Sequence, residues 1–138
     1  MKKQLQQLWD FQSAYNSTKN TTPTLIEPDD YFLRYRLGKE ELLEYLDACN
    51  NDDIVEITDA LADQLYILLG TMVAHGMQDI IEDVFNEVHR SNMSKLGENG
   101  KPIYREDGKV LKGPNYSPPN ITQFIPSTQL EIPFDEEV

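Results

Sequence analysis

Apolar residues recur at helical spacing in the middle of the chain, and this recurrence constrains the fold more than any other feature of the sequence. The residues that carry it stand three or four positions apart: Ile54, Ile57, Leu61, Leu65 and Leu68. Such spacing places side chains on one face of an α-helix, which then needs a core to pack against. Asp52 or Asp53 can cap the start of this helix, and Gly76 after His75 is suited to end it. The pattern therefore predicts a long core helix over about 54–75.

Three other segments have the spacing and composition of helices. The first covers residues 2–16 and places four side chains on one stripe: Leu5, Leu8, Gln12 and Tyr15. A loop rich in turn-forming residues separates it from the second helix, which Asp29 or Asp30 can cap and which ends near Asn50. The last runs from about 77 to 97. Four helices of this kind predict an all-α fold, a four-helix bundle.

The end of the chain differs in composition from the predicted helices. Six of the eight prolines follow residue 100, and two short β-prone stretches surround Asp107-Gly108 within residues 102–113. This pattern predicts a short β-hairpin. The tail over 116–138 is too apolar to stay free in solvent, as five residues indicate: Phe124, Ile125, Leu130, Ile132 and Phe134. We expect a helical bundle at 1–97 and, at 98–138, a hairpin and an extended tail that pack on the bundle or on a partner subunit.

Charge is distributed unevenly along the chain. The 24 Asp and Glu residues exceed the 12 Lys and Arg residues, which gives a formal net charge of −12. Residues 90–112 hold six of the basic residues and three acids, a local charge of +3 that leaves −15 on the remainder. A body with this much negative charge argues against a nucleic-acid polymer as a partner.

Other features of the composition exclude further classes. Cys49 is the only cysteine, so an intramolecular disulfide framework and a cysteine-based zinc site are excluded. No run of 18 apolar residues occurs, so we expect no membrane partner. The first residues have two lysines but no apolar segment after them, which is unlike a signal peptide. The expectation is a soluble cytoplasmic protein.

Six carboxylates form two stripes on the second and third predicted helices. Residues three or four positions apart share a helix face. One stripe consists of Glu40, Glu41 and Glu44, and the other of Glu56, Asp59 and Asp63. If the two helices pack antiparallel, the stripes can face each other, and the repulsion between their charges favours a cation between them. Carboxylate oxygens suit Mg²⁺ or Mn²⁺. The alternative, a solvated acidic face, is the more common meaning of any one such pair.

These acids occur within an arrangement that resembles a known family. EELLE at 40–44, then EITD at 56–59 with Asp63 in DALADQLY, is similar to the Glu-Glu-x-x-Glu and Glu-x-x-Asp signature of the MazG-like all-α nucleoside triphosphate pyrophosphohydrolases. EVHRSNMSKL at 87–96 and DGKVLKGP at 107–114 resemble the phosphoribosyl-ATP pyrophosphohydrolase-like branch. Two features depart from the pattern: the gap of 11 residues between Glu44 and Glu56 is short, and Phe11-Gln12 stands where relatives often have Phe-His.

The resemblance implies a Mg²⁺-dependent enzyme, with Mn²⁺ as an alternative ion, that assembles as a homodimer or homotetramer. It would cleave a nucleoside triphosphate, or a related nucleotide, between the α- and β-phosphates to give a monophosphate and pyrophosphate. Carried over to matching positions, the metal ligands are Glu41, Glu44, Glu56 and Asp59. Glu40 and Asp63 could bind a second metal ion or orient the attacking water, and Glu40 is the preferred general base.

Basic and polar residues downstream are candidates for binding the substrate. Asn92 and Lys95 lie one turn apart on the fourth predicted helix, and Lys109 and Lys112 lie in the predicted hairpin. Their charges could reach the β- and γ-phosphates, although simple solvation is the alternative for the hairpin pair. Two other functions stay open: a phosphoribosyl-ATP pyrophosphohydrolase of histidine biosynthesis, and a non-catalytic nucleotide-binding helical dimer.

Overall fold

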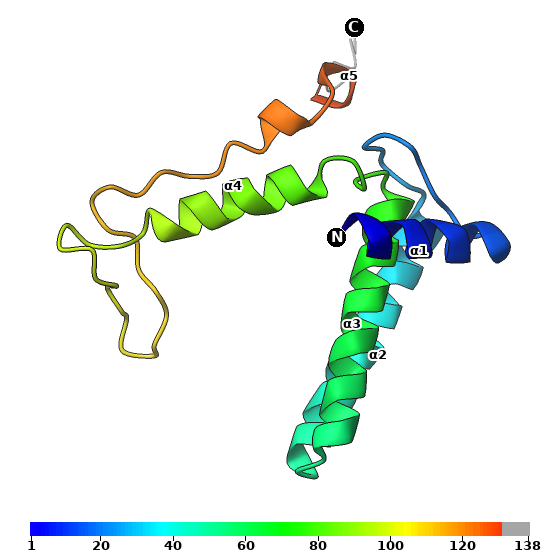
Figure 1. Ribbon diagram of the computed structural model, residues 1–138, viewed down its shortest axis with the longest axis horizontal. Helices are drawn as coiled ribbons and strands as arrows, with labels where there is room; N and C mark the ends of the chain where they lie inside the picture. Colours follow the sequence, from blue (N-terminus) through cyan, green and yellow to red (C-terminus); the bar gives the residue numbers. More distant parts are fainter. Residues whose placement is uncertain (131–138) are drawn as a thin grey trace, which may run out of the picture. The chain divides into compact units, whose positions relative to one another are not determined.

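The computed structural model describes residues 1–130, and no strand occurs among them (Figure 1). The all-α class predicted from the sequence is therefore confirmed. The elements in chain order are α1 (Lys2–Ala14), α2 (Pro28–Asn50), α3 (Ile54–Ala74), α4 (Ile81–Met93), the 3₁₀-helix η1 (Thr122–Phe124) and α5 (Ser127–Leu130).

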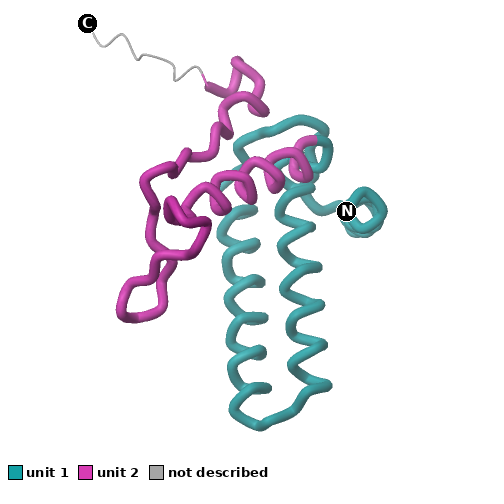
Figure 2. The backbone as a smooth tube through the Cα atoms, turned by 60° about the vertical axis from the view of Figure 1, so that its left-hand side comes forward, with its two compact units in different colours: residues 1–79 teal, residues 80–138 magenta. Residues whose placement is uncertain are grey.

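The chain divides into two compact units, residues 1–79 and residues 80–138 (Figure 2). The first unit contains α1, α2 and α3, and the second contains α4, η1 and α5. The domain boundary expected at residue 97, and the assembly of all four long helices into one bundle, stay predictions.

Both ends of α3 follow the sequence prediction. The side chain of Asp53 caps the start, because its Oδ1 accepts hydrogen bonds from the backbone N–H groups of Val55 and Glu56, both at 3.1 Å. At the other end His75 is the C-cap and Gly76 follows with φ of +75°. A Cβ atom at Gly76 would lie 2.1 Å from the carbonyl oxygen of Thr22. Glycine therefore meets two requirements there, the left-handed backbone and the close approach of the loop.

The starts of α2 and α4 differ from the prediction. Helix α2 begins at Pro28 with Glu27 as its N-cap, so neither Asp29 nor Asp30 caps it. Proline is favoured at this first position because its φ is already helical and it lacks an N–H to satisfy. The two aspartates instead occupy the first turn, where negative charge interacts favourably with the helix dipole. Helix α4 is shorter than predicted at both ends.

The core of the first unit forms where α1 and α2 pack on α3. Helix α1 contributes Leu5, Leu8 and Gln12 to it, three of the four residues predicted to share a stripe. Tyr15 is the C-cap just after α1 and is 69% exposed, so it does not belong to the core. The buried residues of α3 are mostly small: Ala60, Leu69, Gly70, Val73 and Ala74.

The apolar stripe of α3 does not face the core of this chain, although the sequence predicts that it should. Four of its five members are exposed, by 49% to 72%: Ile54, Leu61, Leu65 and Leu68. The prediction of a core stripe is therefore wrong for the single chain. The physical reason is that Ala60, Gly70 and Ala74 let the neighbouring helices approach closely, so the small residues face α1 and α2 and the larger side chains are left outside.

The second unit consists of α4 and the segment that follows it. The predicted β-hairpin is not supported, because residues 102–113 form no strand and contain one isolated antiparallel bridge, between Tyr104 and Val110. The tail is also less extended than predicted, since it forms η1 and α5. It contacts α4 where Glu87 accepts a hydrogen bond from the backbone N–H of Asn120, at 3.0 Å. Ile132 and Phe134, which were predicted to belong to this tail, lie outside the described residues.

By length and composition alone, α3 could also cross a membrane, a property that it shares with core helices of soluble proteins. Helix α3 packs against α1 and α2, as a core helix of a soluble protein does. The absence of a membrane partner stays a prediction.

The contact at Gly76 gives a test of the fold. We expect Gly76→Ala to lower the free energy of unfolding by about 2–4 kcal/mol, because the left-handed backbone and the collision with Thr22 each add a cost. Gly108→Ala is the matched control: Gly108 has φ of +84° but nothing within 4 Å of a Cβ atom. Urea unfolding of both variants measures the difference, and equal losses would contradict the close approach of Thr22.

Candidate functional site

A half-buried arginine joins the two helices that carry the acidic stripes. Helices α2 and α3 lie side by side along their length (Figure 1). Arg34 of α2 donates from Nε to Thr71 Oγ1 at 2.9 Å and from Nη2 to the carbonyl oxygen of Ile67 at 2.6 Å. Burial lowers the pKa of this guanidinium. Gly70 makes room for it, since a Cβ atom there would lie 2.5 Å from Nη2. Arg34 therefore sets how α2 is aligned along α3.

This alignment places acids of both helices close enough to Glu41 for their charges to shift its pKa. Its Oε2 atom is buried and has no hydrogen-bond partner among the described residues. Burial raises the pKa of Glu41 first, and the negative charges of four other residues raise it further: Glu44, Asp63, Glu40 and Asp59. Two of these lie on α2 and two on α3. We call Glu41 and these four residues the acidic cluster.

Glu56 is the one predicted site acid outside the acidic cluster. It is exposed and, with Asp59, lines a shallow hollow of about 640 Å³ formed by residues of α3 alone. The four neighbours of Glu41 are exposed as well. The structure thus brings five of the six candidate acids near one another and leaves Glu56 beside them on the first turn of α3.

The donor chemistry of the acidic cluster fits a hard divalent cation, because every candidate ligand is a carboxylate oxygen. Across residues 1–130, however, no group of three or more Asp, Glu, His or Cys side chains is arranged to hold a metal ion. Repulsion between uncompensated carboxylates gives a physical reason for this, since it favours conformers that hold the side chains apart. The unpaired Oε2 of Glu41 marks the position where a positive charge would relieve the most unfavourable interaction.

An apolar groove lies between α2 and α3 beside the acidic cluster. It has a volume of about 720 Å³ and ten lining residues: Arg34, Tyr35, Gly38, Lys39, Leu42, Gln64, Leu65, Ile67, Leu68 and Thr71. We call it the α2–α3 groove. Gln64 follows Asp63 directly, and its Nε2 is a buried donor with no partner among the described residues.

Sequence reasoning missed both Arg34 and Gln64. Neither belongs to a stripe of like residues, so helical spacing alone does not mark them. The signal that could have indicated Arg34 is Gly70 inside a long helix, because glycine is costly there unless another group needs the space.

The four residues predicted to bind the substrate belong to the second unit, whereas the acids belong to the first. Asn92 is exposed near the end of α4, and Lys95 is half-buried just after it. Lys109 and Lys112 are exposed, and the ammonium of Lys112 lies 4.7 Å from the ring centre of Tyr116. That these four residues bind the same substrate as the acids stays a prediction.

The charge on Glu41 gives a prediction about stability. The pKa of Glu41 in the folded chain is raised, so stability falls as pH rises from the usual glutamate range through the raised value. We expect Glu41→Gln to raise the urea midpoint of unfolding at pH 7 and to have little effect at pH 3.5, where the carboxyl is protonated in both states.

Asp47→Asn is the matched control, because Asp47 lies on the same helix but is not among the residues that shift the pKa of Glu41. A Glu41→Gln variant that is less stable than the unaltered protein at pH 7 would contradict an uncompensated charge at this position.

Comparison with known families bears on these residues. A family model described as phosphoribosyl-ATP pyrophosphohydrolase matches residues 8–92, more than half of the chain. The match includes all six candidate acids and reaches Asn92, whereas Lys95, Lys109 and Lys112 lie beyond it. A comparison with curated proteins found no match.

Proposed function

Because the chain belongs to the phosphoribosyl-ATP pyrophosphohydrolase family, whose members are hydrolases that act on phosphoanhydrides, we propose that it is a Mg²⁺-dependent nucleoside triphosphate pyrophosphohydrolase. It cleaves the α–β phosphoanhydride and releases a nucleoside monophosphate and pyrophosphate. The observation that supports this most is the convergence of acidic charge from α2 and α3 on the buried, unpaired Oε2 of Glu41.

The acids take different roles in this proposal. Glu41, Glu44, Glu56 and Asp59 hold the metal ion. A bound Mg²⁺ would compensate the negative charges of protein and substrate, polarise the α-phosphoryl group and make a water at the site more acidic. Glu40 accepts the proton of the attacking water, and Asp63 orients that water or helps to hold a second ion. Both carboxylates are exposed, and the charge of each raises the pKa of Glu41. These two observations support a place for Glu40 and Asp63 at the edge of the metal site.

Groups of the second unit contact the remaining phosphates. The phosphates of the substrate are negatively charged, and residues 90–112 are the segment of the chain with a net positive charge, +3. Asn92 donates from its side-chain amide, while Lys95, Lys109 and Lys112 act as point charges on the β- and γ-phosphates. The exposure of Asn92, Lys109 and Lys112 supports this role, because each is free to meet a ligand from solvent.

Pyrophosphate release tests the assignment of the acids. With Mg²⁺ present we expect Glu41→Gln and Asp59→Asn to reduce turnover to background, and Glu40→Gln to reduce it by about 100- to 10,000-fold as loss of a general base does. Asp47→Asn keeps the activity of the unaltered protein and controls for loss of charge on α2. Full activity in the Glu41 and Asp59 variants would show that the metal site lies elsewhere.

The matching family model favours a second candidate function, because its description names phosphoribosyl-ATP as the substrate. A panel of nucleoside triphosphates and phosphoribosyl-ATP, assayed with Mg²⁺ and with Mn²⁺, separates the two. The highest kcat/KM with phosphoribosyl-ATP would assign the chain to histidine biosynthesis. Binding of nucleotide without any release of pyrophosphate would assign it to a non-catalytic module.

We also propose that the chain self-associates, as a homodimer or homotetramer, through the α2–α3 groove. Leu42, Leu65 and Leu68 line this groove and are 50% to 57% exposed. Gly38 lines it too, and a Cβ atom there would meet nothing within 4 Å in the chain. Glycine inside a helix costs about 1 kcal/mol relative to alanine, so a close-packed partner over Gly38 would explain a residue that the single chain does not require.

Light scattering with size exclusion tests this assembly. We expect the unaltered protein to have at least twice the mass of one chain and Leu68→Glu to shift it toward the monomer, since a charge then lies within the buried groove. Leu25→Glu is the control, because Leu25 is 87% exposed and lies outside the groove. A monomer for the unaltered protein at micromolar concentration contradicts the proposal.

A further inference from the structure

Tyr66 lies on the face of α3 that carries two acids of the acidic cluster. Asp59, Asp63 and Tyr66 follow one another at spacings of four and three residues, which places their side chains in one row along the helix. Only about 4.5 Å of helix rise separate Asp63 from Tyr66. Gly70 continues the row, and the helix is covered there, because a Cβ atom would lie 2.5 Å from Arg34 Nη2. Tyr66 is therefore the last accessible side chain of this row beside the acids.

Helix α1 supports the ring of Tyr66 in this place. The ring centre of Phe11 lies 5.5 Å from that of Tyr66, and the two ring planes are at 85°. Tyr15, just after α1, lies against Phe11 in turn, with 4.6 Å between the ring centres. Aromatic pairs at such distances and angles attract each other beyond the area that they bury. We call Phe11, Tyr15 and Tyr66 the aromatic cluster.

Much of the aromatic cluster is accessible to a ligand. The exposed fractions are 41% for Phe11, 69% for Tyr15 and 39% for Tyr66. A ring perpendicular to Tyr66 covers one of its faces at most, so Phe11 leaves at least one face uncovered. Exposed apolar side chains that adjoin one another form the kind of patch that marks a binding surface. The aromatic cluster thus offers a stacking surface next to the acidic cluster.

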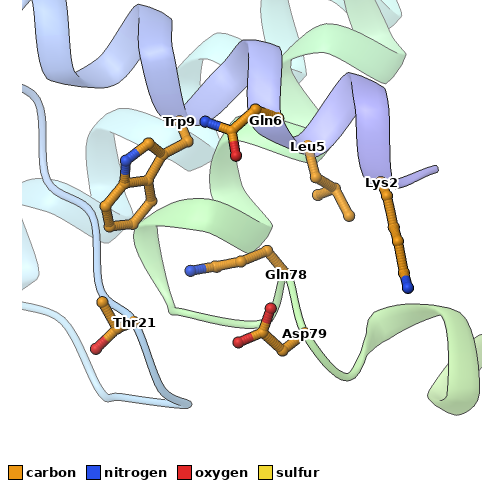
Figure 3. A pocket seen from close by; sticks show the side chains of 7 residues that line it. All are labelled: Lys2, Leu5, Gln6, Trp9, Thr21, Gln78 and Asp79. Carbon is orange, nitrogen blue, oxygen red and sulfur yellow. The ribbon is translucent and has the colours of Figure 1, made fainter.

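The other aromatic residue of α1 has different surroundings. Trp9 lines a cavity together with Gln78 and Asp79, which follow α3 (Figure 3). The ammonium of Lys19 lies 4.4 Å from the centre of its ring. Within residues 1–130, Trp9 makes no ring contact with the aromatic cluster. It is therefore a matched control, an aromatic side chain on the same helix but outside the cluster.

The proposed substrate has a part that matches this surface. With its phosphates at the acidic cluster, its ribose and base extend along the first unit. Toward Tyr66 the base meets aromatic rings, whereas the hollow beside Glu56 has aliphatic walls, which include Ile54 and Val55. Stacking on an aromatic side chain is favourable for every base, because every base has a π-face. The direction of Tyr66 is the one that provides this contact.

We propose, on the basis of that proposed function, that the aromatic cluster binds the nucleoside part of the substrate. The base stacks on the ring of Tyr66, and Phe11 keeps this ring in position. None of the three members of the cluster lines the α2–α3 groove, so the surface proposed for self-association does not include them.

Inorganic tripolyphosphate provides the comparison that tests this contact, since it has a phosphate chain and no base. With Mg²⁺ present, we expect Tyr66→Leu to raise the KM for ATP by about tenfold or more. The same change should leave kcat, and the inhibition constant of tripolyphosphate, close to those of the unaltered protein. Phe11→Leu should raise the KM for ATP in the same selective way, because Phe11 supports the ring. Trp9→Leu should leave all three constants unchanged.

Tyr66→Phe separates the ring from its hydroxyl. Because the ring remains, we expect the KM for ATP to stay much closer to that of the unaltered protein than in Tyr66→Leu. A rise as large as in Tyr66→Leu would show that the hydroxyl holds the substrate and would overturn the stacking contact. An unchanged KM in Tyr66→Leu would overturn it as well. Equal losses for ATP and tripolyphosphate would do the same, because they indicate damage to the metal site or to the fold.

The result is separable from that of the proposed hydrolysis. If no triphosphate yields pyrophosphate, the proposed function fails, and calorimetric titration of the same variants with ATP and with tripolyphosphate, both with Mg²⁺, makes the same comparison as dissociation constants. Binding of neither ligand to the unaltered protein would refute both proposals. If circular dichroism shows that Tyr66→Leu does not fold, Phe11→Leu carries the comparison, with Trp9→Leu still as its control.

Discussion

The guanidinium of Arg34 is the interaction on which the first unit depends. It reaches across from α2 to two groups of α3, the carbonyl oxygen of Ile67 and the hydroxyl of Thr71, and Gly70 leaves the space for it. The carbonyl oxygen of Ile67, which also accepts from the Thr71 hydroxyl, gains a charge-assisted donor this way. Because the bond ties particular turns of the two helices together, it determines which acids of α2 face which acids of α3. The acidic cluster and the α2–α3 groove both follow from that alignment.

What the sequence predicted well depends on local chemistry. The Asp53 cap and the Gly76 terminus of α3 were correct because each is determined by a few neighbouring residues. Spacing alone also grouped Glu40, Glu41 and Glu44 on α2 and Asp59 with Asp63 on α3, whereas Glu56, predicted to join them, lies outside the acidic cluster. The direction of the apolar face did not follow in this way: Leu61, Leu65 and Leu68 share a face as predicted, yet the single chain packs α3 through small residues instead. Periodicity identifies which residues lie together on a helix, and it does not identify the partner that covers them.

Arg34 and the predicted hairpin also depend on tertiary contacts, which short sequence patterns do not identify. Arg34 has no partner near it in sequence, because its contacts are 33 and 37 residues away, so no short motif could have revealed it. Around Asp107-Gly108 the turn does form, with Asp107 accepting a hydrogen bond from the backbone N–H of Lys109. The flanking residues form one isolated bridge, Tyr104 with Val110, bordered by backbone hydrogen bonds from Arg105 to Lys109 and from Leu111 to Ile103, and they do not extend into strands. Turn chemistry was therefore readable from the sequence, whereas strand pairing also needed a packed face that these exposed residues lack.

The exposed leucines of the α2–α3 groove have a consequence for how this protein behaves when it is diluted. If a second copy covers that surface, part of the folding free energy belongs to the association and varies with the logarithm of protein concentration. The melting temperature is then not a constant of the chain. A newly synthesised copy, before it meets another, also presents the groove to every other apolar surface in the cell, which makes the interval between folding and assembly the period in which it is most prone to aggregate.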